Sequence, residues 1–281
     1  MQGAPVAERI RAEVAEAVDE LGEVGLATVQ VGENEASTIY LRLKHRAASE
    51  VEIASVDHKL PHEISEEELL GIVAELNADE GLDGILIQLP LPDHIDEARV
   101  IAAVDPVKDV DGFHPFNAGQ LYLGRPTHVP ATPLGLMALL AEYRIPLDGA
   151  RAVVVGRSTI VGKPVAHLLL QAHATVTICH SHTDDLSRHT LDADVLVVAA
   201  GVPEIITADM VKSGAAVVDV GINRTEAGIV GDVDPDVAQR VAFLTPVPGG
   251  VGPMTIAMLL ANTVRAARYR RGLLAFPGVR R

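Results

Sequence analysis

Short apolar segments alternate along this chain with longer amphipathic stretches. A short, continuous apolar run bounded by turn residues predicts a strand that is buried on both faces. Such strands belong to parallel sheets that are covered by helices. We therefore expect an α/β protein with helices packed on mainly parallel sheets. The predicted strands are residues 25–31, 53–60, 84–89, 151–156, 175–179, 195–199 and 216–220.

Two of the predicted helices have start signals. Ser65 and Glu68 have the spacing of a capping box, which predicts a helix after Ser65. Thr132 is followed by Pro133, and this pair predicts a helix capped by Thr132 that ends near Tyr143. The other predicted helices are residues 7–21, 37–50, 165–170 and 254–271.

The composition is that of a packed globular protein. With 281 residues, 48% hydrophobic and 22% charged, the chain can form one large or two medium domains. It has no Trp and only four Tyr and four Phe, so the core is expected to be aliphatic. No apolar run reaches the roughly 18 residues of a membrane span, and the first residues lack signal-peptide features. The single Cys179 excludes an intrachain disulfide, and we expect a cytoplasmic protein.

The net charge of -15 argues against a nucleic-acid partner, because the field of the protein would repel phosphates. Most basic residues are arginines, so each lysine can be considered individually. The lysines are Lys44, Lys59, Lys108, Lys163 and Lys212.

A glycine-containing loop follows the predicted strand 151–156. Gly156 and Gly162 lie six residues apart, and Pro164 begins the next helical stretch. Glycines between a strand and a helix allow phosphate groups to approach the backbone at the helix N-terminus. The spacing is neither G-x-G-x-x-G nor a Walker A loop, so an ordinary strand-to-helix turn is an equally good interpretation.

The end of the next predicted strand bears on the cofactor. NAD-binding proteins usually carry an acidic residue there, which binds the ribose 2′-hydroxyl. This chain has His180, Ser181 and His182 instead, and Arg157 is available from the glycine loop. These side chains suit a 2′-phosphate and predict NADP, although a solvated loop is an alternative interpretation for His182.

Two candidate groups lie in the first half of the chain. Tyr40 and Lys44 are four residues apart on a predicted helix, so they share one face. Such a pair is commonly exposed on the surface without a function, but a partly buried lysine can act as a base or polarising group.

Gln88 lies near the end of a predicted parallel strand, where ligands bind. Its side-chain amide is therefore expected to face a ligand. The alternative is that backbone groups satisfy this amide.

Two further segments combine unusual residues. Residues 108–112 form an acidic Asp-x-Asp-Gly turn, but the rest of a calcium loop is missing, so we predict no metal. An aspartate there could accept hydrogen bonds from a heterocycle.

Residues 245–255 hold three prolines and three glycines between apolar runs. They are expected to form neither a helix nor a central strand, but a stiff, buried loop open to a ligand, or else a Pro-rich turn.

Together, five segments resemble the bifunctional methylenetetrahydrofolate dehydrogenase/methenyltetrahydrofolate cyclohydrolase family. They occur in the family's order and cover nearly the whole chain, which makes the resemblance specific. The segments are Tyr40-Leu-Arg-Leu-Lys44, Gln88-Leu-Pro-Leu-Pro92, Lys108-Asp-Val-Asp-Gly112, Gly156-Arg-Ser-Thr-Ile-Val-Gly-Lys-Pro164 and Pro246-Val-Pro-Gly-Gly-Val-Gly-Pro-Met-Thr255.

The resemblance implies two α/β domains with the active-site cleft between them. A folate-binding domain would comprise residues 1–128 and 262–281, and a Rossmann-like NADP-binding domain residues 129–261. The implied activity is oxidation of 5,10-methylenetetrahydrofolate by NADP, followed by hydrolysis of the methenyl product to 10-formyltetrahydrofolate. The implied partners are a folate substrate and a second copy of the chain, in a homodimer.

The resemblance also implies roles for individual residues. Lys44 would be the central catalytic residue, assisted by Gln88, with Tyr40 lining the folate site and Asp111 holding the pterin. The remaining folate-site residues would be Leu89, Pro90, Pro248, Gly249, Gly250 and Pro253. The cofactor would contact Gly156, Arg157, Ser158, Val161, Gly162, Pro164, His180, Ser181, Ile222 and Gly250.

The chain departs from the family pattern at Gln2-Gly-Ala-Pro5, Glu52 and Ala131, none of which is a proposed catalytic group. Three other functions are alternatives: a dehydrogenase with weak cyclohydrolase activity, a catalytically silent binding protein, and another NADP dehydrogenase of the shikimate type. The presence of Lys44, Tyr40 and Gln88 together argues against the first. The intact loop at Pro248 argues against the second.

Overall fold

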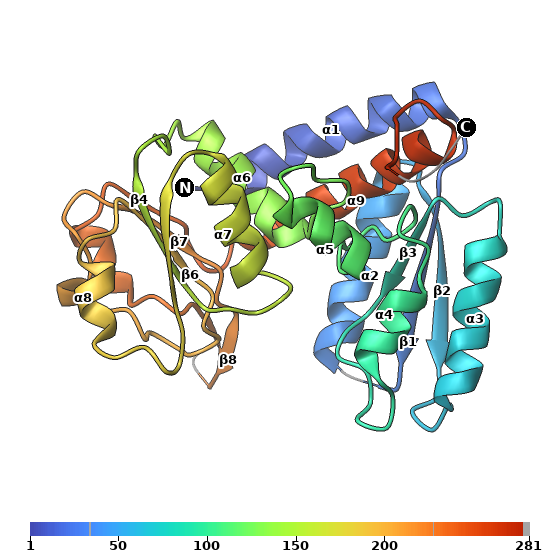
Figure 1. The fold of residues 1–281 in the computed structure, drawn as a ribbon, viewed down its shortest axis with the longest axis horizontal. Helices are drawn as coiled ribbons and strands as arrows, with labels where there is room; N and C mark the ends of the chain where they lie inside the picture. The colour runs from blue at the N-terminus through green and yellow to red at the C-terminus, as the bar shows by residue number, and fades with distance from the viewer. Residues whose placement is uncertain (34, 227, 278–281) are drawn as a thin grey trace. The chain divides into compact units, whose positions relative to one another are not determined.

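The computed structural model describes residues 1–33, 35–226 and 228–277. The chain forms two compact units, each with its own parallel sheet (Figure 1). The three-stranded unit comprises Arg9–Val129 and Ile256–Arg281, and the five-stranded unit comprises Met1–Glu8 and Pro130–Thr255. The predicted two-domain α/β architecture with parallel sheets is therefore confirmed. In the described ranges, no helix combines the length and apolar character that a membrane span needs.

The sheet of the three-stranded unit has the order β2-β1-β3, and both pairings are parallel. Strand β1 (Gly25–Val31) is central and buried at every position, as its apolar run predicts. Strands β2 (Ala54–Leu60) and β3 (Gly84–Ile87) flank it. Beyond β3, Ile85 forms a parallel bridge with Asp109, so the acidic turn continues from a segment that runs beside the sheet.

Helix α3 begins with the predicted capping box: Ser65 Oγ accepts from the Glu68 N–H at 3.2 Å, and Glu68 Oε2 accepts from the Ser65 N–H at 3.1 Å. Its inner face contributes to the aliphatic core over the sheet. Two short helices that had not been predicted, α4 and α5, follow β3. The helices of this unit are α1 (Ala4–Leu21), α2 (Glu35–Glu50), α3 (Glu66–Ala78), α4 (Glu97–Ala103), α5 (Pro115–Tyr122) and α9 (Val251–Arg270), of which α1 and α9 also extend into the other unit.

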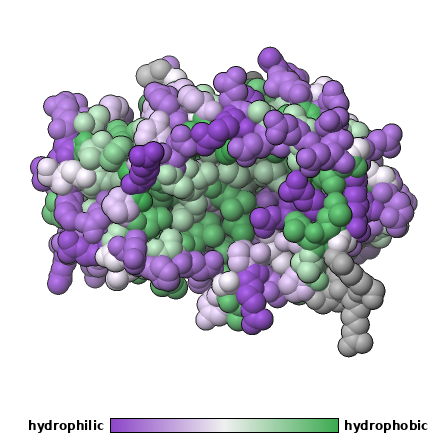
Figure 2. All heavy atoms as spheres, turned by 90° about the horizontal axis from the view of Figure 1, so that it is seen from above, coloured by the Kyte–Doolittle hydropathy of each residue, from purple (hydrophilic) through white to green (hydrophobic). Residues whose placement is uncertain are grey.

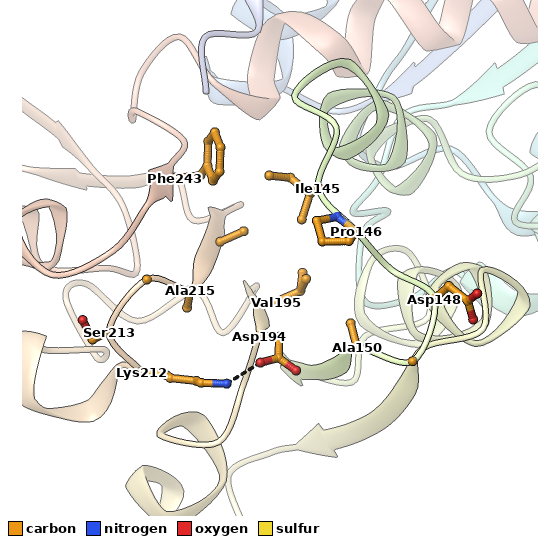
Figure 3. A pocket seen from close by; sticks show the side chains of 13 residues that line it. Ile145, Pro146, Asp148, Ala150, Asp194, Val195, Lys212, Ser213, Ala215 and Phe243 are labelled. Carbon is orange, nitrogen blue, oxygen red and sulfur yellow. Dashed lines mark hydrogen bonds and ion pairs between the residues drawn. The ribbon is translucent and has the colours of Figure 1, made fainter.

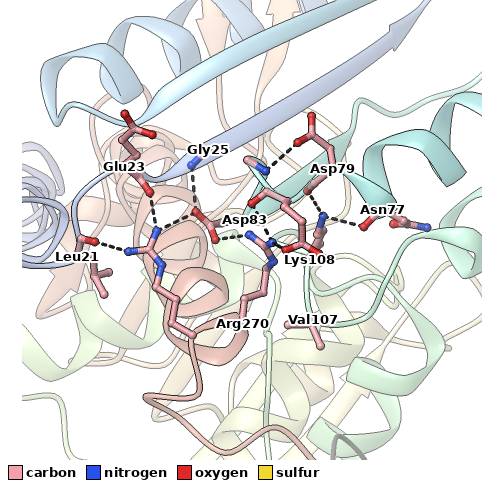
Figure 4. A network of polar contacts seen from close by, with 12 residues as sticks. Leu21, Glu23, Gly25, Asn77, Asp79, Asp83, Val107, Lys108 and Arg270 are labelled. Carbon is pink, nitrogen blue, oxygen red and sulfur yellow. Dashed lines mark hydrogen bonds and ion pairs between the residues drawn. The ribbon is translucent and has the colours of Figure 1, made fainter.

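A buried aspartate joins the end of α9 to the sheet. Asp83 is 2% exposed and accepts from Arg270 Nη1 at 2.6 Å and from the Gly25 N–H at 3.1 Å (Figure 4). A second arginine, Arg271, lies 3.4 Å from the same carboxylate. This network fixes the last turn of α9 beside the start of β1.

A second buried group in the same region is Lys108. Its side chain is 3% exposed, and Nζ donates to the carbonyl oxygens of Leu76, Asn77 and Asp79 at 3.1, 2.8 and 2.7 Å (Figure 4). The last carbonyls of a helix have no partner within the helix and carry its partial negative charge. Lys108 therefore uses all three of its donors to close the end of α3.

His128 is fully buried and neutral in this unit. Its Nε2–H donates to the Val107 carbonyl at 2.8 Å, and in the described part of the chain Nδ1 has no partner. The ring packs edge-on against Tyr269, with the centroids 5.4 Å apart. Burial lowers the pKa of His128 to about 4.

We expect His128 to make stability depend on pH. Because its pKa is lower in the folded than in the unfolded chain, the unfolded state binds more protons between pH 6.5 and 4. The contribution of His128 is therefore complete above pH 6.5 and falls by about 3 kcal/mol toward pH 4. In His128→Phe this loss is absent, so urea unfolding at pH 7 and pH 4 should show the stability difference between wild type and variant changing by about that amount. A difference that stays constant with pH would contradict the assignment.

The sheet of the five-stranded unit has the order β10-β7-β6-β4-β5, with every pairing parallel. The first and third strands in sequence are neighbours, so the strand order reverses between β4 and β6, as in doubly wound folds. The strands are β4 (Arg151–Val155), β5 (Thr175–Cys179), β6 (Val195–Val198), β7 (Ala216–Asp219) and β10 (Phe243–Leu244). A small antiparallel hairpin, β8 (Asn223–Thr225) with β9 (Gly228–Val230), follows β7.

The start of helix α6 differs from the prediction. The helix begins at Ala131 after Pro130, and Thr132 does not cap it. The Thr132 hydroxyl instead shares a hydrogen bond of 2.9 Å with Thr255. Pro133 lies in the first turn, where its missing N–H leaves no unpaired donor. The helical elements of this unit are α6 (Ala131–Glu142), α7 (Gly162–Gln171), α8 (Leu186–Thr190), η1 (Ala208–Met210) and η2 (Pro235–Gln239).

The expectation that residues 245–255 form no helix was wrong for their second half. Helix α9 begins at Val251 and includes Gly252 and Pro253 in its first turn. The first N–H groups of a helix have no intrahelical partner, so proline is tolerated there. Only residues 246–250 form the loop, and Pro248 is exposed at its tip.

Candidate functional site

Lys44 lies on α2, and its side chain is 7% exposed. Its Nζ donates to Gln88 Oε1 at 3.2 Å and lies 5.1 Å from the centroid of the Tyr40 ring. The four-residue helical spacing places Tyr40 and Lys44 on one face, as predicted, and that face is turned toward the end of β3. The alternative of an exposed surface pair does not fit this burial.

Gln88 follows directly after β3 and is held at both ends of its amide. Nε2 donates to the Leu89 carbonyl at 2.7 Å, while Oε1 accepts from Lys44. The main-chain N–H of Gln88 donates to Val29 at 2.8 Å, which anchors this residue to the central strand. A backbone carbonyl therefore satisfies the amide nitrogen of Gln88, and the amide oxygen orients the Lys44 amine.

Asp111 interacts electrostatically with Lys44. Burial raises the pKa of Asp111 to about 6; the charge of Lys44 opposes this shift and that of Asp109 adds to it. Burial also lowers the pKa of Lys44, and the charge of Asp111 opposes that shift. Both side chains therefore change protonation closer to neutral pH than in water, which suits proton transfer.

The two aspartates of the acidic turn have different surroundings. Asp109 is buried and accepts from Asn117 Nδ2 at 2.7 Å and from the N–H groups of Phe113 and His114 at 3.2 and 2.8 Å. These bonds hold the turn and the start of α5. The Asp111 carboxylate makes no hydrogen bond with any residue in the described ranges, so its acceptor positions are available to a ligand.

The glycine loop after β4 is more than an ordinary turn. A Cβ atom on Gly156, which has φ +123°, would lie 2.1 Å from the Ala199 carbonyl oxygen. A Cβ atom on Gly162 would lie 2.3 Å from the carbonyl oxygen of Gly156. Only glycine fits at both positions, because backbone segments approach each other closely.

The N-terminus of α7 is already hydrogen-bonded within this loop. Ser158 Oγ accepts from the N–H groups of Val161 and Gly162 at 3.1 and 3.2 Å. The Ser158 carbonyl accepts from Lys163 at 3.0 Å, and Pro164 is buried in the first turn. Ser158 Oγ therefore pairs with two of the N–H groups at the start of α7, and phosphate binding at this helix end stays a prediction. In the described part of the chain, the unpaired N–H groups of the loop are those of residues 157–160.

The end of β5 places His180 and Ser181 in a tight turn. The His180 N–H donates to Thr183 Oγ1 at 2.9 Å, and the ring Nδ1 accepts from the His182 N–H at 3.2 Å. Ser181 and Arg157 are exposed, and neither pairs with another residue in the described ranges. The β5 end thus offers a hydroxyl but no carboxylate, in keeping with the sequence prediction.

The loop at residues 246–250 contacts the N-terminal segment within the five-stranded unit. The Gly3 N–H donates to the Gly249 carbonyl at 2.9 Å, and a Cβ atom on Gly3 would lie 1.8 Å from the carbonyl oxygen of Gly250. Gly249 itself has φ +105°. Sequence reasoning named Gly3 only as part of the departure at Gln2-Gly-Ala-Pro5 and did not place it beside this loop. Ile222, another predicted cofactor contact, follows β7 and is 59% exposed.

The five-stranded unit also has a pocket of about 460 Å³ at the amino ends of its strands (Figure 3). Lys212 and Asp194 form an ion pair at one side of it, and Phe243 and Ile145 line it at the other. None of the predicted site residues lies there. Doubly wound sheets bind ligands at the carboxyl ends of their strands, so we assign the site to the loops after β4, β5 and β7 instead.

Comparison with known proteins decides the family. A model of the tetrahydrofolate dehydrogenase/cyclohydrolase catalytic domain matches residues 1–111, and a model of the NAD(P)-binding domain of the same proteins matches residues 130–271. The chain belongs to the tetrahydrofolate dehydrogenase/cyclohydrolase family. The resemblance inferred from the five sequence segments is thereby confirmed.

Relatives in the tetrahydrofolate dehydrogenase/cyclohydrolase family match along nearly the whole chain. The bifunctional protein FolD of Halothermothrix orenii is 55% identical, covering 96% of this chain and 98% of its own. That of Moorella thermoacetica is 56% identical, covering 95% and 98%.

Solved structures of the same family match the fold of this chain along nearly its whole length. FolD of Campylobacter jejuni is 48% identical with a TM-score of 0.94, covering 96% of this chain and 98% of its own. FolD of Trypanosoma brucei, complexed with NADP cofactor and inhibitor, is 39% identical with a TM-score of 0.92 and covers 98% of both chains. A shikimate dehydrogenase of Aquifex aeolicus, 14% identical with a TM-score of 0.51, shares the fold alone.

Proposed function

We propose that this protein oxidises 5,10-methylenetetrahydrofolate with NADP to the 5,10-methenyl form and hydrolyses that product to 10-formyltetrahydrofolate. Family membership supports both activities. The observation that carries the proposal for this chain is the buried Lys44, held by Gln88 and interacting electrostatically with Asp111, whose carboxylate makes no hydrogen bond within the described ranges.

In this proposal Asp111 binds the pterin, because a carboxylate can accept hydrogen bonds from a ring N–H and an amino group together. Tyr40, Leu89 and Pro90 line the folate site. Pro248, Gly249, Gly250 and Pro253 form a second set of folate contacts.

Lys44 provides the proton transfer for hydrolysis. The methenyl group is cationic, and a nearby positive charge shifts a desolvated lysine further toward the neutral amine. Neutral Lys44 accepts a proton from the water whose oxygen bonds to the methenyl carbon. It then returns the proton to N5 as the bond between that carbon and N5 breaks. The second proton of the former water is lost from the hydroxyl oxygen to solvent as the C=O bond of the N10-formyl group forms. Gln88 keeps the amine in place through its Oε1.

The residues of the five-stranded unit fit NADP. Arg157 and Ser181 are exposed, without protein partners in the described part of the chain, and no carboxylate occupies the end of β5 where NAD-binding proteins use one. NADP, when bound, accepts the hydride. We assign the 2′-phosphate to Arg157 and Ser181. The other proposed cofactor contacts are Gly156, Ser158, Val161, Gly162, Pro164, His180, Ile222 and Gly250.

Arg157→Ala should raise the KM for NADP at least ~10-fold and leave the KM for NAD within about twofold, because a charged contact to phosphate contributes roughly 1.5–3 kcal/mol. Initial rates with each cofactor measure this. Arg224→Ala is the control, since it removes the same charge from an exposed position of the same unit. Undiminished preference for NADP in Arg157→Ala would refute the phosphate role.

The finer organisation is also proposed. We assign residues 1–128 and 262–281 to the folate-binding domain and residues 129–261 to the NADP-binding domain. We propose a homodimer, because β5 is an edge strand and exposes Ile178 to 42%. Figure 2 shows apolar residues at the surface among charged ones. A cytoplasmic location agrees with the single, buried Cys179.

The function is tested by mixing the protein with methylenetetrahydrofolate and either NADP or NAD, and following the absorbance of NADPH and of the methenyl species. We expect NADPH to form and the methenyl absorbance to decay faster than in buffer. Methenyl loss at the buffer rate would leave only the dehydrogenase. No absorbance change with either cofactor would reject the proposal in favour of a silent binding protein.

A further inference from the structure

Two aspartates are buried together in the five-stranded unit, and neither is among the residues assigned above. Asp219 ends β7 and is 3% exposed, and Asp232 follows β9 and is 0% exposed. The proposed chemistry uses neither of them. Carboxylates are rarely buried this completely unless they are paired with cations or fully hydrogen-bonded.

The Asp232 carboxylate binds two loops at once. Its Oδ2 accepts from the N–H groups of Ala200 and Gly201 at 2.7 and 2.8 Å. Its Oδ1 accepts from Asn223 Nδ2 at 2.8 Å. Ala200 and Gly201 follow β6, whereas Asn223 begins the hairpin after β7.

The Asp219 carboxylate binds Asp232 itself and the residues next to the pair. Oδ1 accepts from the N–H groups of Gly221 and Asp232 at 2.9 and 3.0 Å. Oδ2 accepts from Val233 at 3.0 Å. The two side chains therefore form one unit that holds together the loops after β6, β7 and β9.

Two glycines make room for the pair. A Cβ atom on Gly221 would lie 2.2 Å from Asp232 Oδ1, and one on Gly231 would lie 1.8 Å from Asp219 Oδ2. Both distances are far below van der Waals contact. Gly221 and Gly231 are therefore required at these positions, because any side chain there would collide with the two carboxylates.

This arrangement buries two carboxylates without a counter-charge in the part of the chain that the structure describes. Among the described residues, no cation lies within 4.0 Å of either carboxylate, so six amide donors alone compensate their burial. Burial raises the pKa of Asp219 to about 6, and the negative charge of Asp232 adds to the shift. Buried charges without counter-charges do not usually increase stability, so a positional role explains them better.

The loops that the pair holds lie at the ligand-binding edge of the sheet. Ala200 and Gly201 leave the carboxyl end of β6, next to the reversal of strand order at β4. The carbonyl of Ala199 is the atom that excludes a side chain at Gly156. The loop after β6 is thus in contact with the glycine loop proposed to hold the phosphates, and Gly221 precedes Ile222.

We propose that Asp232, supported by Asp219, is a positioning residue that fixes the loops after β6 and β7 for binding of the dinucleotide. It acts through the backbone N–H groups of Ala200 and Gly201 and the side-chain amide of Asn223, and does not itself touch the cofactor. The inference rests on the proposed function, because it assigns these loops to NADP.

The test compares Asp232→Ala, Asp232→Asn and Asn223→Ala with wild type. The dissociation constant of NADP is measured by calorimetry, and cyclohydrolase turnover is measured on methenyl substrate without any NADP. Asp232→Ala should weaken NADP binding at least ~10-fold, because two loop N–H groups lose their acceptor. Asp232→Asn keeps an oxygen for Ala200 and Gly201 and should stay within about threefold. Asp236→Ala, an exposed aspartate of the same segment, is the control.

Cyclohydrolase turnover distinguishes positioning from general damage, since it needs no NADP. Weakened NADP binding with cyclohydrolase turnover within about twofold of wild type would support the inference. Unchanged NADP binding in Asp232→Ala, or a parallel loss of both properties in Asp232→Ala and Asp232→Asn, would overturn it. If Asp232→Ala does not fold, the milder Asn223→Ala must weaken NADP binding in the same selective way, or the inference fails. Wild type that neither binds nor reduces NADP would instead reject the proposed function.

Discussion

Replacing Lys44 with Met is expected to lower cyclohydrolase kcat at least ~100-fold without lowering stability. Proton transfer by a positioned side chain contributes roughly 10²–10⁴-fold, and Met retains the length but not the amine. Stability should be unchanged or higher, because the variant no longer buries an ammonium group whose pKa burial has lowered. The dehydrogenase rate should fall less, since hydride transfer requires alignment and not a base.

The measurements are single-substrate cyclohydrolase kinetics, NADP reduction rates and urea unfolding at pH 7.5. Lys59→Met is the matched control, because it removes the same charge from an exposed lysine on β2. Normal cyclohydrolase turnover in Lys44→Met would remove Lys44 from the mechanism. An equal loss in Lys59→Met would point to net charge as the cause.

Replacing Lys108 with Met should have the opposite outcome: a loss of about 3 kcal/mol in the free energy of unfolding, with little change in kcat per folded molecule. The substitution leaves the carbonyls of Leu76, Asn77 and Asp79 without their shared donor. Each buried acceptor without a partner costs roughly 1–3 kcal/mol, and removal of the buried ammonium offsets part of that cost.

Urea unfolding of Lys108→Met and the Lys59→Met control measures the loss, which for an exposed lysine should be below about 0.5 kcal/mol. The same Lys-to-Met substitution at the two buried lysines therefore distinguishes a catalytic role, expected for Lys44, from a structural role, expected for Lys108. Wild-type stability in Lys108→Met would show that water satisfies these carbonyls. A ~100-fold loss of kcat at full stability would instead place Lys108 in the catalytic machinery.

The sequence predicted strands where short apolar runs mark them, and β3, β6 and β7 are buried at every position. The short strands β8 and β9 carry no such run, and neither they nor β10 were predicted. Residues 25–31 and 175–179 match β1 and β5 at both ends. Short helices such as α4 were missed because seven residues do not show a helical period. The start of α9 was missed because Gly252 and Pro253 break helices everywhere except in the first turn.

The candidate site was predictable where spacing along one element decides contact. Tyr40 and Lys44 share a helix face because they are four residues apart, and this does not depend on how the helix packs. The contact of Lys44 with Gln88 depends on packing α2 against β3, which the resemblance implied and periodicity could not show. The different roles of Asp109 and Asp111 depend on hydrogen bonds made by residues elsewhere in the chain, so the Asp-x-Asp pattern alone did not separate them.

The pair of buried aspartates has a consequence for the motions of the loops around it. Five backbone amide protons, those of Ala200, Gly201, Gly221, Asp232 and Val233, point at carboxylates inside the protein although none belongs to a named helix or strand. Amides of this kind exchange with solvent deuterium only when the structure opens. Gly201 is exposed at the surface, yet its proton should exchange as slowly as those of the neighbouring strands. In this part of the molecule, surface exposure and rigidity are therefore independent properties.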